Sequence, residues 1–259
     1  MASSSQVNAT ASSFKALHKP GDPIVFTNIW SVASANLVAS LPQTKALATA
    51  SFAVAREYGV EDSELTFEQN IATAQAVAKV ATKANLPLTV DFQDGYGNRL
   101  EEGISKLVQA GVVGINLEDY STAKKEFFPI DEAASRIKNV LKTAADLGVA
   151  DFVVNARVDV LWHDGSIDEA IKRGKAYLEA GATTVFVWRR GRELPKEEIK
   201  QLVDAFSGRL NVGWQRNGST VGDYKKLGVA RVSLGPQLML FGADAIKKEA
   251  ARIQDEINL

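Results

Sequence analysis

The sequence predicts an α/β fold, a single-domain (β/α)8 TIM barrel, from three observations. Apolar segments of strand length alternate with segments of helical periodicity eight times in 259 residues, which is the order and size typical of this barrel. Polar side chains collect after the carboxyl ends of these strands, whereas the amino ends are plain. The turn after the first strand, at 28–31, has no glycine, and this disfavours an open nucleotide-binding sheet.

The predicted elements follow from hydrophobic periodicity and from turn residues at their ends. Strands are predicted over residues 24–28, 45–50, 88–91, 113–117, 151–156, 183–188, 210–213 and 229–234. Helices are predicted over residues 31–41, 66–84, 100–110, 131–147, 166–180, 194–206, 221–227 and about 237–257. Residues 1–12, rich in Ser, Ala and Thr, are expected to be a flexible lead, and residues 13–259 to form the barrel domain.

Composition narrows the classes of partner. The net charge is −1, so no overall positive field attracts nucleic acid. The chain has no cysteine, which excludes disulfides, thiolate metal sites and a cysteine nucleophile. No apolar stretch approaches the length of about 18 residues that a membrane span needs, and no secretory signal is evident. We therefore expect no membrane association and a cytoplasmic location.

Acidic residues follow two successive strands. Asp91 and Asp94 lie at the end of the third strand, and Glu118 and Asp119 follow the fourth. If these strands are parallel neighbours, the carboxylates converge on one rim, where pairs about 4 Å apart repel by roughly 4 kcal/mol at an effective dielectric near 20. Such a rim needs a proton or a cation, and Mg²⁺ suits oxygen ligands of this kind. The alternative is that these acids cap helices or pair with lysines.

Arg157 lies in the motif NARVD at 155–159, just after the fifth strand. Its planar guanidinium can bind a substrate carboxylate through two hydrogen bonds. A simple ion pair of Arg157 with Asp159 or Glu118 is the alternative.

Two further features mark the same end of the barrel. All four tryptophans, at positions 30, 162, 188 and 214, fall at or just beyond strand ends and predict a partly apolar, water-poor mouth, with ordinary rim packing as the alternative. Residues 120–129 predict a loop that closes over a ligand or a solvated connection. Candidates for proton transfer are Lys124, Lys125, Tyr120 and Tyr96.

Seven short motifs occur in a specific order. They are FKALH at 14–18 with NIW at 28–30, GVED at 59–62, DFQDGYGN at 91–98, GINLED at 114–119, NARVD at 155–159 and GVARVSLGP at 228–236. Together they make the chain similar, over most of its length, to the phosphoenolpyruvate mutase and isocitrate lyase superfamily. The resemblance implies a barrel whose last helix is exchanged between subunits of a dimer or tetramer. It also implies magnesium and small 2-oxo or 2-hydroxy acid substrates.

By this resemblance Asp91 and Glu118 hold magnesium directly or through water, and Asp62 completes its shell. Gln93 stands where the family usually has Asp or Glu, so one negative charge is missing and a weaker metal site is expected unless that contact is made through water. Arg157 binds the substrate carboxylate by the same comparison.

Three departures narrow the chemistry. The absence of cysteine excludes lyase chemistry that depends on the family's Lys-Cys-Gly-His loop. Residues 120–129 match the phosphonomutase loop poorly, and Trp188 stands where the mutases carry a histidine, so phosphoryl migration is not favoured. The chain looks closest to a less characterised branch of the superfamily.

The sequence therefore predicts a magnesium-dependent lyase or hydrolase that cleaves a carbon-carbon bond of a small carboxylate of the oxaloacetate or substituted-malate type, through a metal-stabilised enolate. The alternatives are phosphonomutase-type chemistry on phosphoenolpyruvate-like acids and a degenerate barrel that binds a carboxylate without turnover. The predicted residues are Arg157, Lys124 and Tyr96 for catalysis; Arg157, Trp188, Trp30 and Trp214 for substrate binding; and Asp91 and Glu118 for the metal. The resemblance to the superfamily adds Ser51 and Phe52 to the substrate contacts, and Asp62 and Gln93 to the surroundings of the metal. A homo-oligomer is expected.

Overall fold

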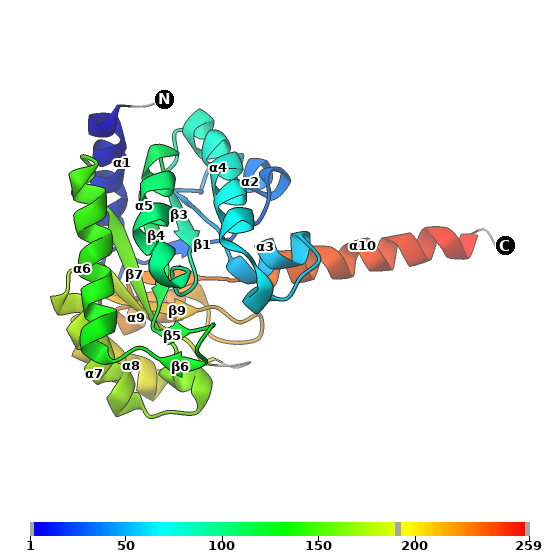
Figure 1. The fold of residues 1–259 in the computed structure, drawn as a ribbon. Helices are drawn as coiled ribbons and strands as arrows, with labels where there is room; N and C mark the ends of the chain where they lie inside the picture. The colour runs from blue at the N-terminus through cyan, green and yellow to red at the C-terminus, as the bar shows by residue number, and fades with distance from the viewer. Residues whose placement is uncertain (1–2, 190–192, 257–259) are drawn as a thin grey trace.

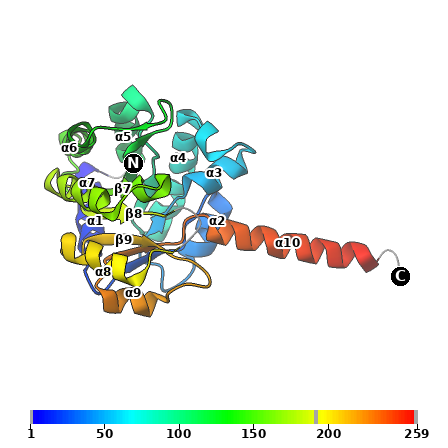
Figure 2. The same cartoon turned by 90° about the horizontal axis from the view of Figure 1, so that it is seen from below.

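Eight parallel strands form the sheet of the protein, in the order β1-β10-β9-β8-β7-β4-β3-β2. The computed structural model describes residues 3–189 and 193–256. The two edges of the sheet meet where Ile29 forms a parallel bridge with Thr49, with its N–H donating to the Ala48 carbonyl at 2.9 Å. Helices surround this nearly closed sheet (Figures 1 and 2). The structure confirms the predicted (β/α)8 barrel.

Each predicted strand overlaps one strand of the barrel, although β2 is shorter than expected. The barrel strands are β1 (Ile24–Phe26), β2 (Leu47–Ala48), β3 (Leu88–Asp91), β4 (Gly114–Glu118), β7 (Val153–Val158), β8 (Thr184–Val187), β9 (Leu210–Gly213) and β10 (Arg231–Ser233). A separate antiparallel hairpin consists of β5 (Tyr120–Ser121) and β6 (Glu126–Phe127).

Each predicted helix is also present. The helices are α1 (Ser4–Ala16), α2 (Val32–Ala39), α3 (Ser51–Glu57), α4 (Phe67–Ala84), α5 (Leu100–Gln109), α6 (Ile130–Asp146), α7 (Ile167–Glu179), α8 (Lys196–Ala205), α9 (Val221–Leu227) and α10 (Gln237–Asp255). Short 3₁₀ helices are η1 (Asp62–Glu64), η2 (Gly97–Arg99) and η3 (Val160–His163). The sequence analysis did not predict α1 or α3.

The expectation of a flexible lead over residues 1–12 is wrong for the described part of that segment, because residues 4–12 lie in α1. Ser3 caps this helix by accepting a hydrogen bond from the Gln6 N–H, as a capping residue does. Val7, Ala11 and Phe14 recur at helical spacing and are buried. The Ser- and Ala-rich composition concealed this narrow apolar face.

Helix α10 leaves the barrel and extends away from it (Figures 1 and 2). None of its described residues is buried, and Leu240, Ile246 and Ile253 are among the exposed large apolar side chains. Among the residues that the structure describes, no helix is both long and apolar enough to cross a membrane.

Candidate active site at the carboxyl end of the barrel

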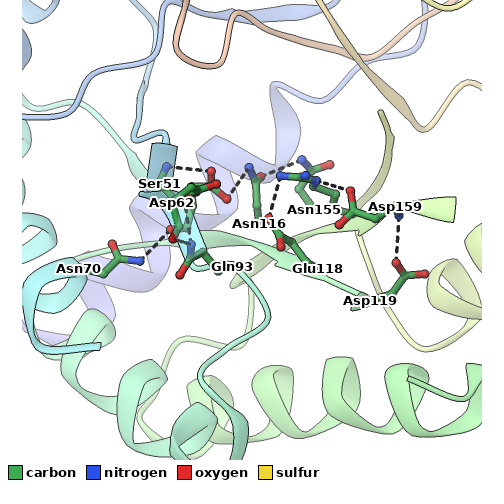
Figure 3. A network of polar contacts seen from close by, with 11 residues as sticks. Ser51, Asp62, Asn70, Gln93, Asn116, Glu118, Asp119, Asn155 and Asp159 are labelled. Carbon is green, nitrogen blue, oxygen red and sulfur yellow. Dashed lines mark hydrogen bonds and ion pairs between the residues drawn. The ribbon is translucent and has the colours of Figure 1, made fainter. Parts of the chain in front are cut away.

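Asp91 is the last residue of β3, and it forms hydrogen bonds with Ser51, Asn70 and Asn116, three labelled members of the polar network in Figure 3. Its Oδ2 accepts a hydrogen bond of 2.9 Å from the backbone N–H of Ser51, which is one of the free donors in the first turn of α3. The backbone N–H of Asp91 donates to Thr49 Oγ1 at 2.9 Å. Only 8% of Asp91 is exposed, and the Ser51 N–H fixes its carboxylate while Thr49 fixes its backbone.

Gln93 and Asp62 join the loop after β3 to η1. Gln93 has a left-handed backbone conformation with φ 48°, and its Nε2 donates to the carbonyl oxygen of Asp62 at 2.7 Å and to its Oδ1 at 3.0 Å. Burial raises the pKa of Asp62, and the negative charge of Asp91 raises it further. Gln93 thus supplies a donor to a carboxylate that already has an acidic neighbour.

Glu118 is the last residue of β4, Arg157 is the last but one of the neighbouring strand β7, and the two form an ion pair of 2.7 Å. Arg157 Nε also pairs with Asp159 Oδ1 at 2.7 Å. Burial raises the pKa of Glu118 well above its usual range, although the positive charge of Arg157 opposes this shift. The Asp159 and Glu118 carboxylates raise the pKa of Arg157 in spite of its burial.

The ion-pair alternative for Arg157 is therefore what the structure shows. Nε and Nη1 are occupied by carboxylates, whereas Nη2 makes no hydrogen bond to any described residue. Because guanidinium donors are arranged as a planar fork, the Nη2 edge is the part of Arg157 that can receive a ligand carboxylate.

The carboxylates suit a cation that keeps much of its water. In the described ranges 3–189 and 193–256, no three His, Asp or Glu side chains are arranged to hold a metal by themselves. Magnesium is commonly bound by one or two carboxylates with water and substrate oxygens completing its shell. Asp62, Asp91 and Glu118 fit that pattern, because burial and the charge of Asp91 raise the pKa of Asp62 and of Glu118 while Arg157 is the nearby cation.

A chain of amides inside the barrel supports Asp91, and the sequence analysis missed it. Thr184 Oγ1 donates to Asn155 Oδ1 at 2.6 Å, Asn155 Nδ2 to Asn116 Oδ1 at 2.8 Å, and Asn116 Nδ2 to Asp91 Oδ1 at 3.5 Å. Asn70 on α4 donates to the Asp91 carbonyl at 3.0 Å. Isolated amides within apolar, strand-length runs were the available signal for these residues.

Tyr96 lies close to this cluster. Its hydroxyl accepts a hydrogen bond of 2.9 Å from Asn70 Nδ2, and its ring packs edge-on against Phe67 and Phe92. Burial raises the pKa of Tyr96 above that of an ordinary phenol. The hydroxyl is therefore protonated at neutral pH and can donate a hydrogen bond, although it is a weaker acid than an ordinary phenol.

The segment 120–129 forms the β5–β6 hairpin with a short tail. The Thr122 N–H, at the start of the turn of this hairpin, donates to Asp94 Oδ2 at 3.0 Å, and Tyr120 stacks on His163 with ring centroids 3.9 Å apart. Lys124 and Lys125 lie in the exposed turn. No described residue forms an ion pair with Lys124.

The tryptophans have different surroundings. Trp188 directly follows β8, and its ring lies on Gly213, where a Cβ would be 1.9 Å from Cζ3. Trp162 lies 6.3 Å from Trp188 between ring centroids. Trp188 thus fills the β8–β9 side of the mouth.

The other predicted substrate contacts lie around this mouth or outside it. Trp214 is partly buried against the main core. Trp30 packs with a small cluster that includes Val54 and lines a groove between α2, α3 and α4, and no described contact joins it to the carboxylates. Phe52 is half-buried in the first turn of α3, beneath the guanidinium of Arg56.

Comparison with known proteins agrees with this architecture. The family model described as phosphoenolpyruvate phosphomutase matches residues 14–254. An uncharacterized protein of Mycobacterium tuberculosis is 33% identical over 246 residues, covering 94% of this chain and 89% of its own. The 2,3-dimethylmalate lyase of Eubacterium barkeri is 31% identical over 167 residues, covering 60% of this chain and 54% of its own.

Solved structures share the fold. A 2,3-dimethylmalate lyase aligns with a TM-score of 0.83 and 21% identity, over 98% of this chain and 88% of its own. A phosphonopyruvate hydrolase in complex with oxalate and Mg²⁺ aligns with a TM-score of 0.81 and 23% identity, over 98% and 88% of the two chains. The chain therefore belongs to the phosphoenolpyruvate phosphomutase family, within a superfamily of lyases, hydrolases and mutases.

Proposed function

We propose that the protein is a magnesium-dependent lyase or hydrolase that cleaves a carbon-carbon bond of a small 2-oxo or 2-hydroxy carboxylate, of the oxaloacetate or substituted-malate type. The observation that carries this proposal is the meeting of Asp91, Glu118 and Arg157 at the ends of the neighbouring strands β3, β4 and β7. That end of the barrel is where such folds place their chemistry. The names of the superfamily relatives support the reaction class.

Asp91 and Glu118 would hold the ion directly or through water, with Asp62 and Gln93 completing its surroundings. When bound, magnesium supplies Lewis-acid stabilisation of the negative charge that develops on a substrate oxygen. Gln93 holds Asp62 in place through two hydrogen bonds. The negative charge that Gln93 lacks is therefore partly offset by the fixed carboxylate of Asp62.

The substrate carboxylate would lie against the Nη2 edge of Arg157, with the start of α3 at Ser51 and Phe52 on its other side. Arg157 is oriented by its two ion pairs, which lowers the conformational cost of binding an anion. The apolar face of Trp188, with Trp214 directly after the neighbouring strand β9, would exclude water from the mouth, whereas Trp30 lies in the groove between α2, α3 and α4.

Proton transfer has two proposed participants. Tyr96 remains protonated because burial raises its pKa, and it lies one hydrogen bond from Asn70, which also holds Asp91. Lys124 is exposed in the hairpin, so its participation needs that hairpin to fold over the mouth.

Calorimetric titration with oxalate, a mimic of the enolate of a 2-oxo acid, tests the site. We expect binding that requires Mg²⁺, and cleavage of at least one 2-oxo or 2-hydroxy acid when a panel is followed by proton NMR. Absence of any Mg²⁺-dependent oxalate binding would contradict the proposal.

A second candidate is a barrel that binds a carboxylate without turning it over, which Gln93 favours because it removes one charge from the proposed metal shell. Binding of oxalate with no turnover of the panel would support that reading. Phosphorus NMR with phosphonopyruvate would detect mutase chemistry.

The protein is also proposed to be a homo-oligomer. Ile246 and Ile253 are exposed and lie seven residues apart on α10, so they share one face of this helix. Isolated helices with an exposed apolar face are covered by a partner, and a second copy of the chain is the proposed partner. Sedimentation of the wild type and of the Ile246→Ser variant is expected to show a smaller species for the variant.

A further inference from the structure

Arg231 is fully buried inside the barrel and connects two opposite walls. It lies on β10, four positions from β4 in either direction around the closed sheet. Its Nη2 donates a hydrogen bond of 3.1 Å to Asn116 Oδ1 on β4, and its guanidinium lies 4.4 Å from the centroid of the Phe26 ring. Nε and Nη1 have no hydrogen-bond partner among the described residues.

An arginine in this setting is a poor stabiliser of the fold. A buried charge is costly unless it is paired and fully hydrogen-bonded, and Arg231 makes a single hydrogen bond. Burial lowers the pKa of Arg231 to about 9, although the charge of Asp91 opposes this shift. Folding stability therefore gives no reason for an arginine here, and residues that break such rules are typical of functional sites.

The hydrogen bond from Arg231 determines which way the Asn116 amide points. Arginine only donates hydrogen bonds, so the atom of Asn116 that faces it must be the oxygen. Asn155 Nδ2 donates to the same oxygen at 2.8 Å. With Oδ1 held by two donors, Nδ2 is directed toward Asp91 Oδ1, at 3.5 Å.

The opposite orientation would disturb Asp91. If the Asn116 amide turned over, its oxygen would face Asp91 Oδ1, and two acceptors without a proton between them repel each other. Asp91 Oδ2 is held by the Ser51 N–H at 2.9 Å, so a shift of the carboxylate would weaken that hydrogen bond. The position of Asp91 thus depends on a donor that comes from the far wall of the barrel.

We propose that Arg231 is a positioning residue for Asp91 and acts through Asn116. The functional part of this inference rests on the proposed function, in which Asp91 is the central carboxylate of the site. The positioning itself does not, because it concerns the protein without ligand.

The first measurement is hydrogen exchange of the Ser51 backbone amide by NMR in unliganded protein. Arg231→Met removes the donor and the charge while keeping an unbranched side chain, and we expect Ser51 to exchange about fivefold faster, as the loss of one modest hydrogen bond allows. Arg231→Lys keeps a donor and should restore part of the protection. Asn211→Ala is the matched control, because Asn211 is a buried interior amide that bonds Ser233 and not Asn116.

The second measurement is the Mg²⁺-dependent affinity for oxalate. Arg231→Met is expected to weaken it about tenfold without lowering the melting temperature, and Asn211→Ala to leave it within twofold. Adding Arg231→Met to Asn116→Ala should cause no further loss, because both changes remove the same connection.

The outcomes separate the two proposals. If wild-type protein binds no oxalate, the proposed function fails, and the Ser51 amide still decides whether Arg231 positions Asp91. Unchanged exchange at Ser51 in Arg231→Met would overturn the positioning role. A lower melting temperature with unchanged exchange and unchanged oxalate affinity would show that Arg231 only packs the core.

Discussion

The two sides of the barrel bury ionisable groups in opposite ways. On the carboxyl side, Glu118 and Arg157 form a buried ion pair of 2.7 Å beside further acids. On the amino-terminal side of β1, His18 lies with its ring edge-on to Phe14, and its Nε2 has no hydrogen-bond partner among the described residues. Burial lowers the pKa of His18 to about 3, and the charge of Arg231 adds to the shift.

The difference shows that buried charges, which lower folding stability, lie at the carboxyl end of the barrel. Burial and neighbouring negative charges raise the pKa of Asp62 and of Glu118, so these two ionised carboxylates lower the stability of the folded state at neutral pH. Around His18 the group is simply kept neutral. A rim of ionised groups that stability does not require is expected at the face where barrels carry function, whereas the other side serves packing.

The largest expected effect is loss of the central carboxylate. Asp91→Asn keeps the shape of the side chain but removes the charge, and we expect Mg²⁺-dependent oxalate affinity to fall about 1000-fold, a change of about 4 kcal/mol. Stability should be unchanged or higher, because the charge next to Asp62 is removed. Calorimetry and urea denaturation measure the two quantities.

Asp204→Asn, at an exposed position on α8, is the control and should change neither quantity. If Asp91→Asn loses stability instead of affinity, the contrast between the two sides of the barrel disappears.

The next effect concerns the ion pairs of Arg157. Arg157→Met leaves the Glu118 and Asp159 carboxylates buried without a partner, which typically costs about 3 kcal/mol of unfolding free energy. Because the folded pKa of Glu118 is already raised, the sign is fixed: protonation in the folded state relieves the penalty, so stability of the variant should rise as pH falls below neutral. Denaturation curves between pH 5 and 8 test this, and Arg157→Lys, which keeps the charge, should lose less.

Much of the fold and part of the site were predictable from sequence. Strand-length apolar runs with polar ends located β3, β4 and β7, and hence the convergence of Asp91, Glu118 and Arg157. The local sequence pattern is sufficient for these three residues, because parallel strands place the side chains near their carboxyl ends on the same rim of the barrel.

The missed features depend on contacts between distant segments. Arg231 lies within an apolar run at 229–234 and gave no local sign that it crosses the interior to Asn116. Helix α1 was missed because its apolar face is narrow, and the partners of Arg157 could not be chosen between Asp159 and Glu118. In the structure it binds both.

A smaller effect is expected from His18. Its pKa is about 3 in the folded protein and about 6.5 in an unfolded chain, so the unfolded state takes up a proton first as pH falls. Stability is therefore present above pH 6.5 and is lost below it, by about 2 kcal/mol between pH 7 and pH 5. His18→Phe should lose much less over this range in urea denaturation.

His163→Gln is the comparison for His18, since His163 is exposed, and it should keep the pH dependence of the wild type. An equal acid sensitivity of His18→Phe and wild type would show that His18 is not held neutral by burial.

The smallest expected effect on oxalate affinity comes from the aromatic side chains at the carboxyl end of the barrel, compared with its charged side chains. Trp188→Ala removes the ring that covers Gly213 but none of the carboxylates, so oxalate affinity should fall only about fivefold, or about 1 kcal/mol. Gly213→Ala keeps the ring and forces it to move, because the new Cβ would lie 1.9 Å from Cζ3. Calorimetry on both variants then separates the presence of the aromatic side chain from its position. Equal losses of oxalate affinity in the two variants would mean that the position of the ring decides the affinity. A loss as large as that of Asp91→Asn would place Trp188 in direct contact with the ligand.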